Sequence, residues 1–438
     1  MLVFVHKISS RLQYACDFIL DQYFGIDYLL TTDVDLFSTS SGPRLNYSSS
    51  SIHGCYKIQP ANLLFEKTIT EQKIDCFDID GYKAFFKSAE SDFSFDIFAA
   101  VFYLLSRYEE YLPHTKDDFG RYAHQNSLAF KEGFLQQPLV DIWLTRFAES
   151  LHTAYPTLVF TKRSFRYLPT YDIDIAWSYK HKGFLRDMGG LVLKPSPERI
   201  QVLRGKAKDP YDCYELLHRL HNAFDLKPTY FFLVASTPGR YDKNSNIAGE
   251  DLKALIKDHA EKYSIGIHPS WKSNEQEGLL AAEKEYLEKQ IGRNIVSSRQ
   301  HYLKFTLPET FKNLINVGIK NDYSMGYGKV NGFRASTATS FFWYDLKEEN
   351  QTDLLVHPFC FMDATSHFQK GLTAQEAYAE MLYYYSVCKE VGGNMITIFH
   401  NNILGGGEDF NGWPEMYERF ISVVTESAAS NQISDSTG

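Results

Sequence analysis

The sequence lacks the features that mark several large classes of protein. It has no Cys-x-x-Cys pair, and its six cysteines are scattered over positions 16, 55, 76, 213, 360 and 388. Such spacing makes a poor disulfide framework, so we expect reduced thiols in a cytoplasmic protein. No Gly-x-Gly-x-x-Gly follows a predicted strand, which argues against nucleotide binding.

Long apolar runs and an excess of positive charge are also missing. No apolar run approaches the roughly 20 residues of a membrane-spanning helix. Residues 1–7 lack the positive region, long apolar segment and small-residue cleavage site of a secretion signal. The net charge of −9 and the pI of about 5.9 are unfavourable for general binding to nucleic acid. We therefore expect a soluble, cytoplasmic protein with no membrane span and no nucleic-acid partner.

What the sequence does contain is ample material for packed interiors, with 438 residues of which 44% are hydrophobic. This length exceeds one ordinary core, so we expect two domains, 1–160 and 161–438. The first domain is predicted to be mixed and largely helical, with a polar loop at 37–51. Its main helices are expected at 12–23, 91–111 and 137–155, and the run 107–111 is predicted to be a solvated helix face.

The second domain alternates strand and helix patterns, which indicates a parallel sheet, open or closed into a barrel. Its strands are predicted at 165–171, 228–236, 263–268, 295–305, 354–357 and 394–400. Its helices are predicted at 211–224, 250–262, 275–292, 311–317 and 373–390.

Two aspartates, Asp172 and Asp174, follow the first of these strands. Side chains on a strand alternate between faces, so residues two apart point the same way. Two carboxylates this close ionise together only with positive charge beside them. One interpretation is a metal ligand and a general base, and the other is a solvated turn that ends the strand.

Polar residues suited to metal binding or catalysis lie toward the C-terminal ends of four further predicted strands. They are His268, Arg299 with His301, His357, and His400. In parallel α/β folds the C-terminal ends of the strands face the active site. A single histidine at a strand end is commonly structural, but this recurrence along the chain favours one shared site.

These segments, in this order over about 165–410, resemble the polysaccharide deacetylase family with its NodB homology domain. Thr170-Tyr171-Asp172-Ile173-Asp174 resembles the first family motif, T-F-D-D, with one residue between the acids. The second motif is similar to the His-Pro-Ser run at 266–272, the third to Arg299-Gln300-His301-Tyr302, and the last to the strand 396–400. The N-terminal part resembles an accessory domain that precedes such deacetylase domains in Bacteroidetes-type proteins.

The resemblance implies a distorted (β/α) barrel and a hydrolase that removes an N- or O-linked acetyl group from a carbohydrate. It implies a divalent metal, foremost Zn²⁺ with Co²⁺, Mn²⁺ or Ni²⁺ as alternatives, held by Asp174 and His268. Asp172 would be the catalytic base, Arg299 its partner, and His400 the acid that protonates the leaving group. The implied partner is an acetylated sugar or polysaccharide of glycan or cell-envelope metabolism.

One position departs from the family pattern. The second metal histidine should fall four residues after His268, where this chain has Lys272. We expect His301 to supply the missing ligand, with His357, Ser270 or water as alternatives.

Three residues are predicted to contact substrate. Trp271 and Tyr302 can stack against a sugar ring, and Arg334 can pair with a substrate carboxylate or phosphate. For the tryptophan core packing is the alternative, and for the arginine a surface position. Two other functions remain open: a metal-free glycan-binding or scaffold protein, and an amidohydrolase acting on a non-sugar C–N bond.

Overall fold

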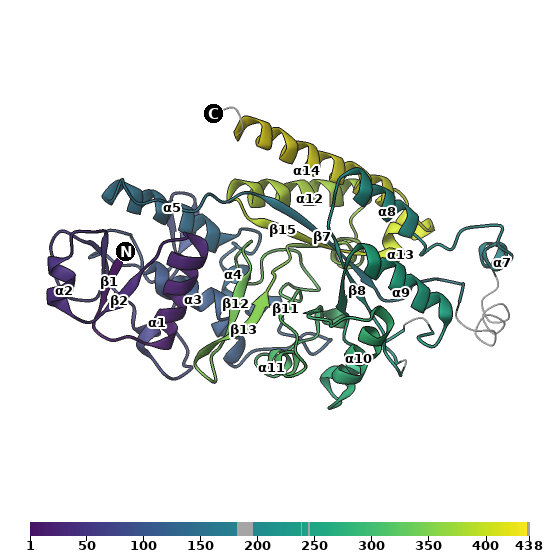
Figure 1. The fold of residues 1–438 in the computed structure, drawn as a ribbon, viewed down its shortest axis with the longest axis horizontal. Coiled ribbons are helices and arrows are strands. Elements are labelled where there is room, and N and C mark those ends of the chain that lie inside the picture. The colour runs from purple at the N-terminus through teal and green to yellow at the C-terminus, as the bar shows by residue number, and fades with distance from the viewer. Residues whose placement is uncertain (182–195, 238, 244–245, 436–438) are drawn as a thin grey trace. The chain divides into compact units, whose positions relative to one another are not determined.

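The computed structural model describes residues 1–181, 196–237, 239–243 and 246–435, with side chains as far as residue 425. These residues form two compact units (Figure 1). Unit 1 consists of Met1–Ser164, Phe333–Val356 and Glu390–Gly393, and unit 2 of Phe165–Gly332, His357–Lys389 and Asn394–Gly438. The predicted division at 160/161 stays a prediction, and the compact units add that 333–356 groups with the N-terminal residues.

Unit 1 contains a parallel sheet of four strands in the order β2-β1-β3-β4, so it is mixed but not largely helical as expected. Its strands are β1 (Leu2–Val5), β2 (Leu29–Thr31), β3 (Arg44–Tyr47), β4 (Tyr56–Ile58), β5 (Phe77–Ile79), β6 (Tyr82–Ala84), β12 (Phe341–Asp345) and β13 (Asn350–Val356). Its helices are α1 (Ser10–Cys16), η1 (Asp17–Tyr23), α2 (Val34–Thr39), η2 (Asn62–Phe65), α3 (Ile97–Leu105), η3 (Tyr108–Tyr111), η4 (His124–Asn126), α4 (Leu128–Lys131) and α5 (Leu139–Ala154). Strands β5 with β6 and β12 with β13 form antiparallel pairs.

Helix α3 is shorter than predicted because its start is set by Asp96. The Asp96 carboxylate accepts a hydrogen bond from the backbone N–H of Ala99 at 3.1 Å, which is an N-cap interaction. Every residue of α3 is buried, so this helix lies in the core of unit 1.

The charged run after α3 is buried, contrary to the predicted solvated face. Arg107 donates to Glu109 and Glu110 at 2.9 Å each, and all three side chains are at most 9% exposed. Burial of these charges is compatible with folding because each one is paired.

Unit 2 is built on parallel strands in the order β11-β10-β9-β8-β7-β15-β14. They are β7 (Arg166–Ile173), β8 (Thr229–Phe232), β9 (Ser264–Ile267), β10 (Ser297–Ser298), β11 (Asn321–Asp322), β14 (Phe361–Met362) and β15 (Asn394–His400). The helices are α7 (Pro197–Leu203), α8 (Tyr214–Ala223), α9 (Glu250–Lys262), η5 (Trp271–Asn274), α10 (Leu279–Ile291), η6 (His301–Leu303), α11 (Glu309–Asn316), η7 (Thr365–Gln369), α12 (Ala374–Glu390), α13 (Asn401–Leu404), η8 (Glu408–Phe410) and α14 (Trp413–Asp435). The α/β class is confirmed, but the described strands do not close into the barrel that we expected.

Helices cover one face of the central strands of unit 2. Tyr171 of β7 contacts His221 of α8 and Tyr417 of α14, and Tyr230 of β8 contacts His259 of α9. In Figure 1 these helices and α12 lie beside β7, β8 and β15.

The opposite face of β7 and β15 leads from a hydrophobic cluster to polar strand ends. The two strands pair in register, with Leu168 beside Ile396, Thr170 beside Ile398, and Asp172 beside His400. Ile396 and Ile398 belong to a buried cluster against which Leu168 packs. Because strand side chains alternate, Asp172 and His400 continue the face on which this cluster lies.

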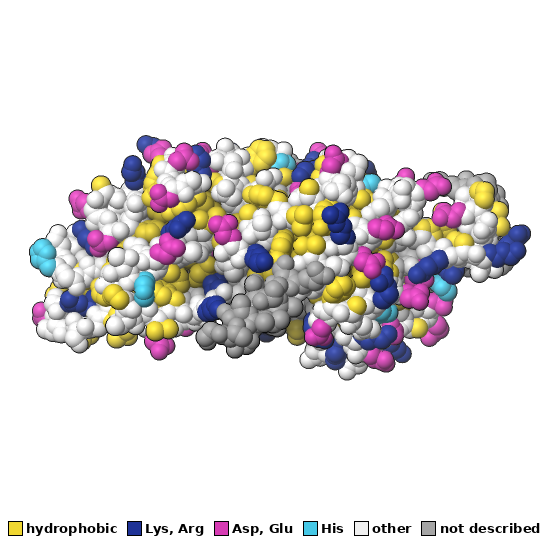
Figure 2. All heavy atoms as spheres, turned by 90° about the horizontal axis from the view of Figure 1, so that it is seen from above, with side chains coloured by type: hydrophobic (Ala, Val, Ile, Leu, Met, Phe, Trp, Pro, Cys, Tyr) yellow, Lys and Arg dark blue, Asp and Glu magenta, His cyan; other side chains and the backbone are white. Residues whose placement is uncertain are grey.

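None of the helices that the structure describes combines the length and the apolar character needed to cross a bilayer. On the face drawn in Figure 2, acidic and basic side chains are interspersed with hydrophobic ones.

Candidate active site

The candidate site lies where four of five successive parallel strands of the sheet end, namely β10, β9, β7 and β15. Asp172 is the second-last residue of β7 and Asp174 directly follows the strand, while His400 is the last residue of β15. His268 follows β9, and His301 comes three residues after β10. Parallel strands place their C-terminal ends at one edge of a sheet, so residues far apart in the sequence meet there.

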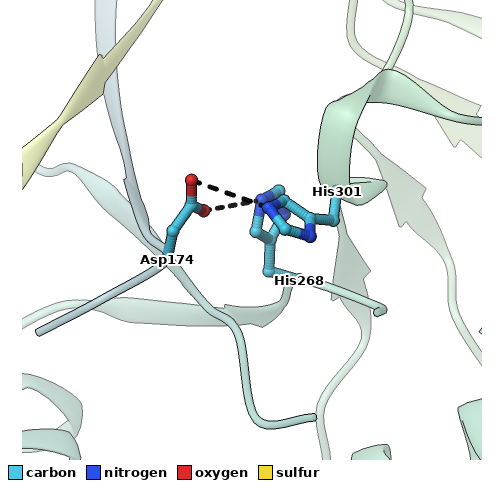
Figure 3. A group of neighbouring side chains, drawn as sticks. All are labelled: Asp174, His268 and His301. Atoms are coloured by element: carbon cyan, nitrogen blue, oxygen red, sulfur yellow. Dashed lines mark ion pairs between the residues drawn. The ribbon is translucent and has the colours of Figure 1, made fainter. Parts of the chain in front are cut away.

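Asp174, His268 and His301 form a tight group (Figure 3). His268 Nε2 lies 3.2 Å from Asp174 Oδ1, and His301 Nε2 lies 3.6 Å from Asp174 Oδ2. One ligand atom from each residue lies within 4.8 Å of the other two. This residue set and this spacing are compatible with the binding of a divalent cation.

The other ring nitrogen of each histidine is anchored by an acceptor. His268 Nδ1 is 2.6 Å from the carbonyl oxygen of Arg299, and His301 Nδ1 is 3.1 Å from Asp242 Oδ1. A carbonyl or carboxylate oxygen only accepts, so Nδ1 carries the proton in both rings. In the neutral imidazole Nε2 then keeps its lone pair, as a metal ligand must.

The Asp174 carboxylate supports the fit of a cation. Its Oδ1 atom is buried and makes no hydrogen bond with a described residue, although His268 Nε2 is near. Two lone pairs facing each other in a buried position are unfavourable unless a proton or a metal ion lies between them. These three residues therefore fit a divalent metal ion.

Protons compete with a metal ion for the position between Asp174 and the two histidines. Burial opposes charge, but His301 and His268 hold the pKa of Asp174 well below its usual range. Likewise, burial lowers the pKa of His301, yet Asp174 and Asp242 outweigh it and raise the pKa to about 9. Metal binding would therefore release a proton from His301.

Asp172 has a different partner. Its Oδ1 accepts from Arg299 Nη1 at 2.8 Å, and its Oδ2 is 3.8 Å from His268 Nε2. Arg299 is fully buried over the ring of Phe231 and also donates to the carbonyl of Tyr323. The bond from the buried Arg299 guanidinium fixes the orientation of the Asp172 carboxylate.

His400 is paired with Asp363, which follows β14. His400 Nδ1 lies 2.6 Å from Asp363 Oδ1, and the His400 backbone N–H donates to Oδ2 at 2.7 Å. Burial lowers the pKa of His400, but Asp363, with Asp174 and Asp172, raises it to about 10. His400 is therefore an imidazolium at neutral pH.

The alternatives for the third ligand lie elsewhere. His357 Nε2 is 3.0 Å from Asn321 Oδ1, and its ring stacks on Tyr323. Ser270 Oγ accepts from the backbone N–H of Ser273 as the N-cap of η5. Lys272 is half-buried and belongs to η5.

The predicted substrate contacts are divided between the units. Trp271 stacks on Tyr241 at 4.1 Å, and Tyr302 meets both rings edge-on and is 38% exposed. Arg334 belongs to unit 1, is 2% exposed, and donates to both carboxylate oxygens of Glu110. This burial argues against the substrate contact expected for Arg334.

Asp242 was not identified from the sequence as a residue of the site. It lies in the segment after β8, and no motif marks it. The available signal was its place after a parallel strand, which many polar loop residues share.

Comparison with known proteins gives a family match for the N-terminal part alone. Residues 1–156 match a family model described as a family of unknown function (DUF7033). No curated protein matches the chain.

The chain is also similar to solved structures. They are a putative polysaccharide deacetylase from Mycobacterium smegmatis (16% identity, TM-score 0.40), Puue allantoinase (12%, 0.39) and a probable polysaccharide deacetylase from Pseudomonas aeruginosa PAO1 (14%, 0.38). Each likeness covers 60% of this chain and 85% of the other. Because these TM-scores are below 0.5, the proposed function depends on the side chains of this chain and not on the likeness.

Proposed function

We propose that this chain is a metal-dependent hydrolase that removes an acetyl group from a carbohydrate. The observation that carries the proposal is the group of Asp174, His268 and His301, with both Nδ1 atoms anchored and both Nε2 atoms near one carboxylate. The sequence resemblance to polysaccharide deacetylases supports the choice of reaction.

Asp174, His268 and His301 would hold the metal, with Zn²⁺ favoured by two imidazoles and one carboxylate. A divalent ion there supplies Lewis acidity, which lowers the pKa of water and polarises the acetyl carbonyl. Asp174 is the one anionic ligand, so the site keeps net positive charge for this purpose.

Asp172 is the proposed general base. Its carboxylate is paired with Arg299 and lies 3.8 Å from His268 Nε2, next to the proposed metal ligands. From there it accepts the proton of the attacking water, and Arg299 keeps it oriented during the transfer.

His400 is the proposed general acid. Its protonated ring, paired with Asp363 through Nδ1, keeps the Nε2 proton for donation. It donates that proton to the leaving amine or alcohol as the bond to the acetyl carbon breaks. Base and acid thus belong to adjacent strands, β7 and β15.

A carbohydrate substrate is favoured by the aromatic residues beside the ligands. Tyr302 directly follows His301 and is exposed, whereas Trp271 packs on Tyr241. Apolar C–H faces of a sugar ring pack on such an exposed ring. Tyr302 is therefore the first candidate for substrate contact.

The test is acetate release from a panel of N- and O-acetylated sugars by protein loaded with Zn²⁺ or Co²⁺. We expect release that falls about 10²–10⁴-fold in Asp172→Asn with the metal content unchanged. If metal-loaded protein releases no acetate, and glycan binding is unaffected by a chelator, the chain is a binding protein and the proposal is wrong.

A further inference from the structure

Asp242 joins three segments of unit 2 next to the proposed metal ligands. It is 1% exposed, and its Oδ1 accepts from the backbone N–H of Trp271 at 2.7 Å and lies 3.1 Å from His301 Nδ1. Its Oδ2 is 3.4 Å from the backbone N–H of Lys272. One carboxylate therefore contacts both η5 and the ring of His301.

His301 needs such an anchor more than His268 does. His268 directly follows β9, and its Nδ1 is held by a backbone carbonyl of the adjacent β10 segment. His301 begins the three-residue η6, and the next residue, Tyr302, has φ of 58°. His301 thus lies three residues beyond the strand pairing of β10, and the contact of its Nδ1 with Asp242 helps to fix its ring.

We propose that Asp242 is a positioning residue that holds His301 with its Nδ1–H bonded and its Nε2 turned toward Asp174. This inference rests on the proposed function, because it assigns His301 as a metal ligand. A carboxylate partner on the distal nitrogen also raises the basicity of the ligand nitrogen.

The arrangement explains how the chain tolerates Lys272. The resemblance places a ligand histidine at that position, and here the same carboxylate that contacts the Lys272 backbone orients His301 instead. The third proposed metal ligand, His301, thus comes from the segment after β10. The helix η5 contributes no ligand, but its backbone binds the carboxylate that orients His301.

Contacts between aromatic rings also hold η5 against the Asp242 segment, and they do not depend on the Asp242 side chain. Tyr241 stacks on Trp271 at 4.1 Å, and Tyr302 meets both rings at 5.4 and 5.7 Å. We therefore expect Asp242→Asn to fold, and we expect its defect to be confined to His301.

The experiment measures Zn²⁺ and Co²⁺ affinity of the full chain by competition with a chromogenic chelator. Asp242→Asn should weaken binding about 10–100-fold. The matched control is Asp209→Asn: Asp209 is 2% exposed and accepts from four backbone N–H groups, of Ser178, Tyr179, Lys180 and Tyr211. The control should bind within about threefold of the wild type, since Asp209 contacts no proposed ligand.

A double-mutant cycle shows whether Asp242 acts through His301. In the background of His301→Ala, adding Asp242→Asn should leave metal affinity unchanged within about twofold. A further loss in this background would mean that Asp242 acts through η5, and the inference would be wrong. Wild-type affinity in Asp242→Asn itself would overturn it as well.

A further measurement needs no change at Asp242. In ¹⁵N-histidine-labelled, Zn²⁺-loaded protein, long-range ¹H–¹⁵N spectra should show His301 protonated at Nδ1, with the signal assigned by its loss in His301→Gln. Protonation at Nε2 would refute the inference. The two proposals fail in different ways. If only the proposed function is wrong, the wild-type protein releases no acetate, but its metal affinity still depends on Asp242.

Discussion

Asp172 and Asp174 are two residues apart, yet their surroundings give them different chemistry. Asp172 is paired with the guanidinium of Arg299, whereas Asp174 faces two imidazole nitrogens. The alternation of strand side chains predicted that both would point to one place. It did not predict the partners, because Arg299 and His301 lie more than a hundred positions further along the chain.

The pair of His400 and Asp363 makes a prediction on pH dependence. Burial lowers the pKa of His400, and Asp363 outweighs burial to give a value of about 10. Asp363→Asn removes this carboxylate, so the imidazolium loses its proton at lower pH. The alkaline limb of the kcat/KM profile should move to lower pH by about 1–3 units. A profile unchanged by Asp363→Asn would show that His400 is not the acid.

The buried ion pairs of unit 1 make a prediction on stability. Glu110 bonds both Arg334 and Arg107, and these arginines, against the effect of burial, lower its pKa to about 2. Glu110→Gln leaves two buried guanidinium groups short of negative charge, and should cost about 3–5 kcal/mol of unfolding free energy.

The control is Glu149→Gln, since Glu149 pairs with Arg146 where both side chains are at least half exposed. It should cost less than about 1 kcal/mol in the same denaturant titration. Equal losses in the two variants would contradict the role given to the Glu110 network.

At the scale of elements, periodicity predicted the long segments of unit 2 well. Helix α9 has the predicted bounds, and β7, β8, β9 and β15 lie within two residues of the predicted starts. Short elements were not predicted, because two or three residues are too few to show a periodic pattern of hydrophobic residues. β10 is confined to Ser297–Ser298 since the chain leaves the sheet at Arg299 to form η6. The strand β3 was not predicted because it lies in a serine-rich segment, 37–51, that was expected to be a polar loop.

Strand β9 positions His268 and depends on a close approach at Gly266. A Cβ at Gly266 would lie 2.4 Å from the ring of Phe231 in β8. Gly266→Ala should therefore lower the free energy of unfolding by about 1–3 kcal/mol and weaken Zn²⁺ binding through His268.

The control for this change is Gly42→Ala, because nothing lies within 4 Å of a Cβ there. It should leave both the stability and the Zn²⁺ affinity at wild-type values. Wild-type Zn²⁺ affinity in Gly266→Ala would show that β9 tolerates the added methyl group without moving His268.

At the scale of the whole molecule, the chain does not follow the simple order of two successive domains. Segment 333–356 returns to unit 1, where the Asp141 carboxylate accepts from the hydroxyls of Thr337 and Thr339. The segment ends in the antiparallel pair β12–β13. From the sequence, 354–357 read as another parallel strand, because a strand pattern does not encode the direction in which the paired strand runs.

The stability of the chain should depend on pH through His259 of α9. His259 is fully buried, and burial lowers its pKa to about 4. Its folded pKa is depressed, so its contribution is complete above about pH 6.5 and is lost as the pH falls toward 4. The loss is about 3 kcal/mol.

Buried carboxyls titrate with the opposite sign, such as Glu283, whose pKa burial raises to about 7. The measurement is therefore the difference in unfolding free energy between His259→Leu and the wild type. This difference should shift in favour of the variant as the pH falls from 6.5 to 4. For His152→Leu, at an exposed position, it should stay flat. A difference that does not change with pH for His259→Leu would contradict the lowered pKa of His259.

The in-register pairing of β7 with β15 has a consequence for evolution of this chain. The proposed proton acceptor and proton donor occupy the same rung of a backbone ladder, Asp172 opposite His400. Their separation is then set by interstrand spacing, which loop insertions leave untouched. Substrate preference can therefore drift through the surrounding loops while the two proton-transfer groups keep a fixed span.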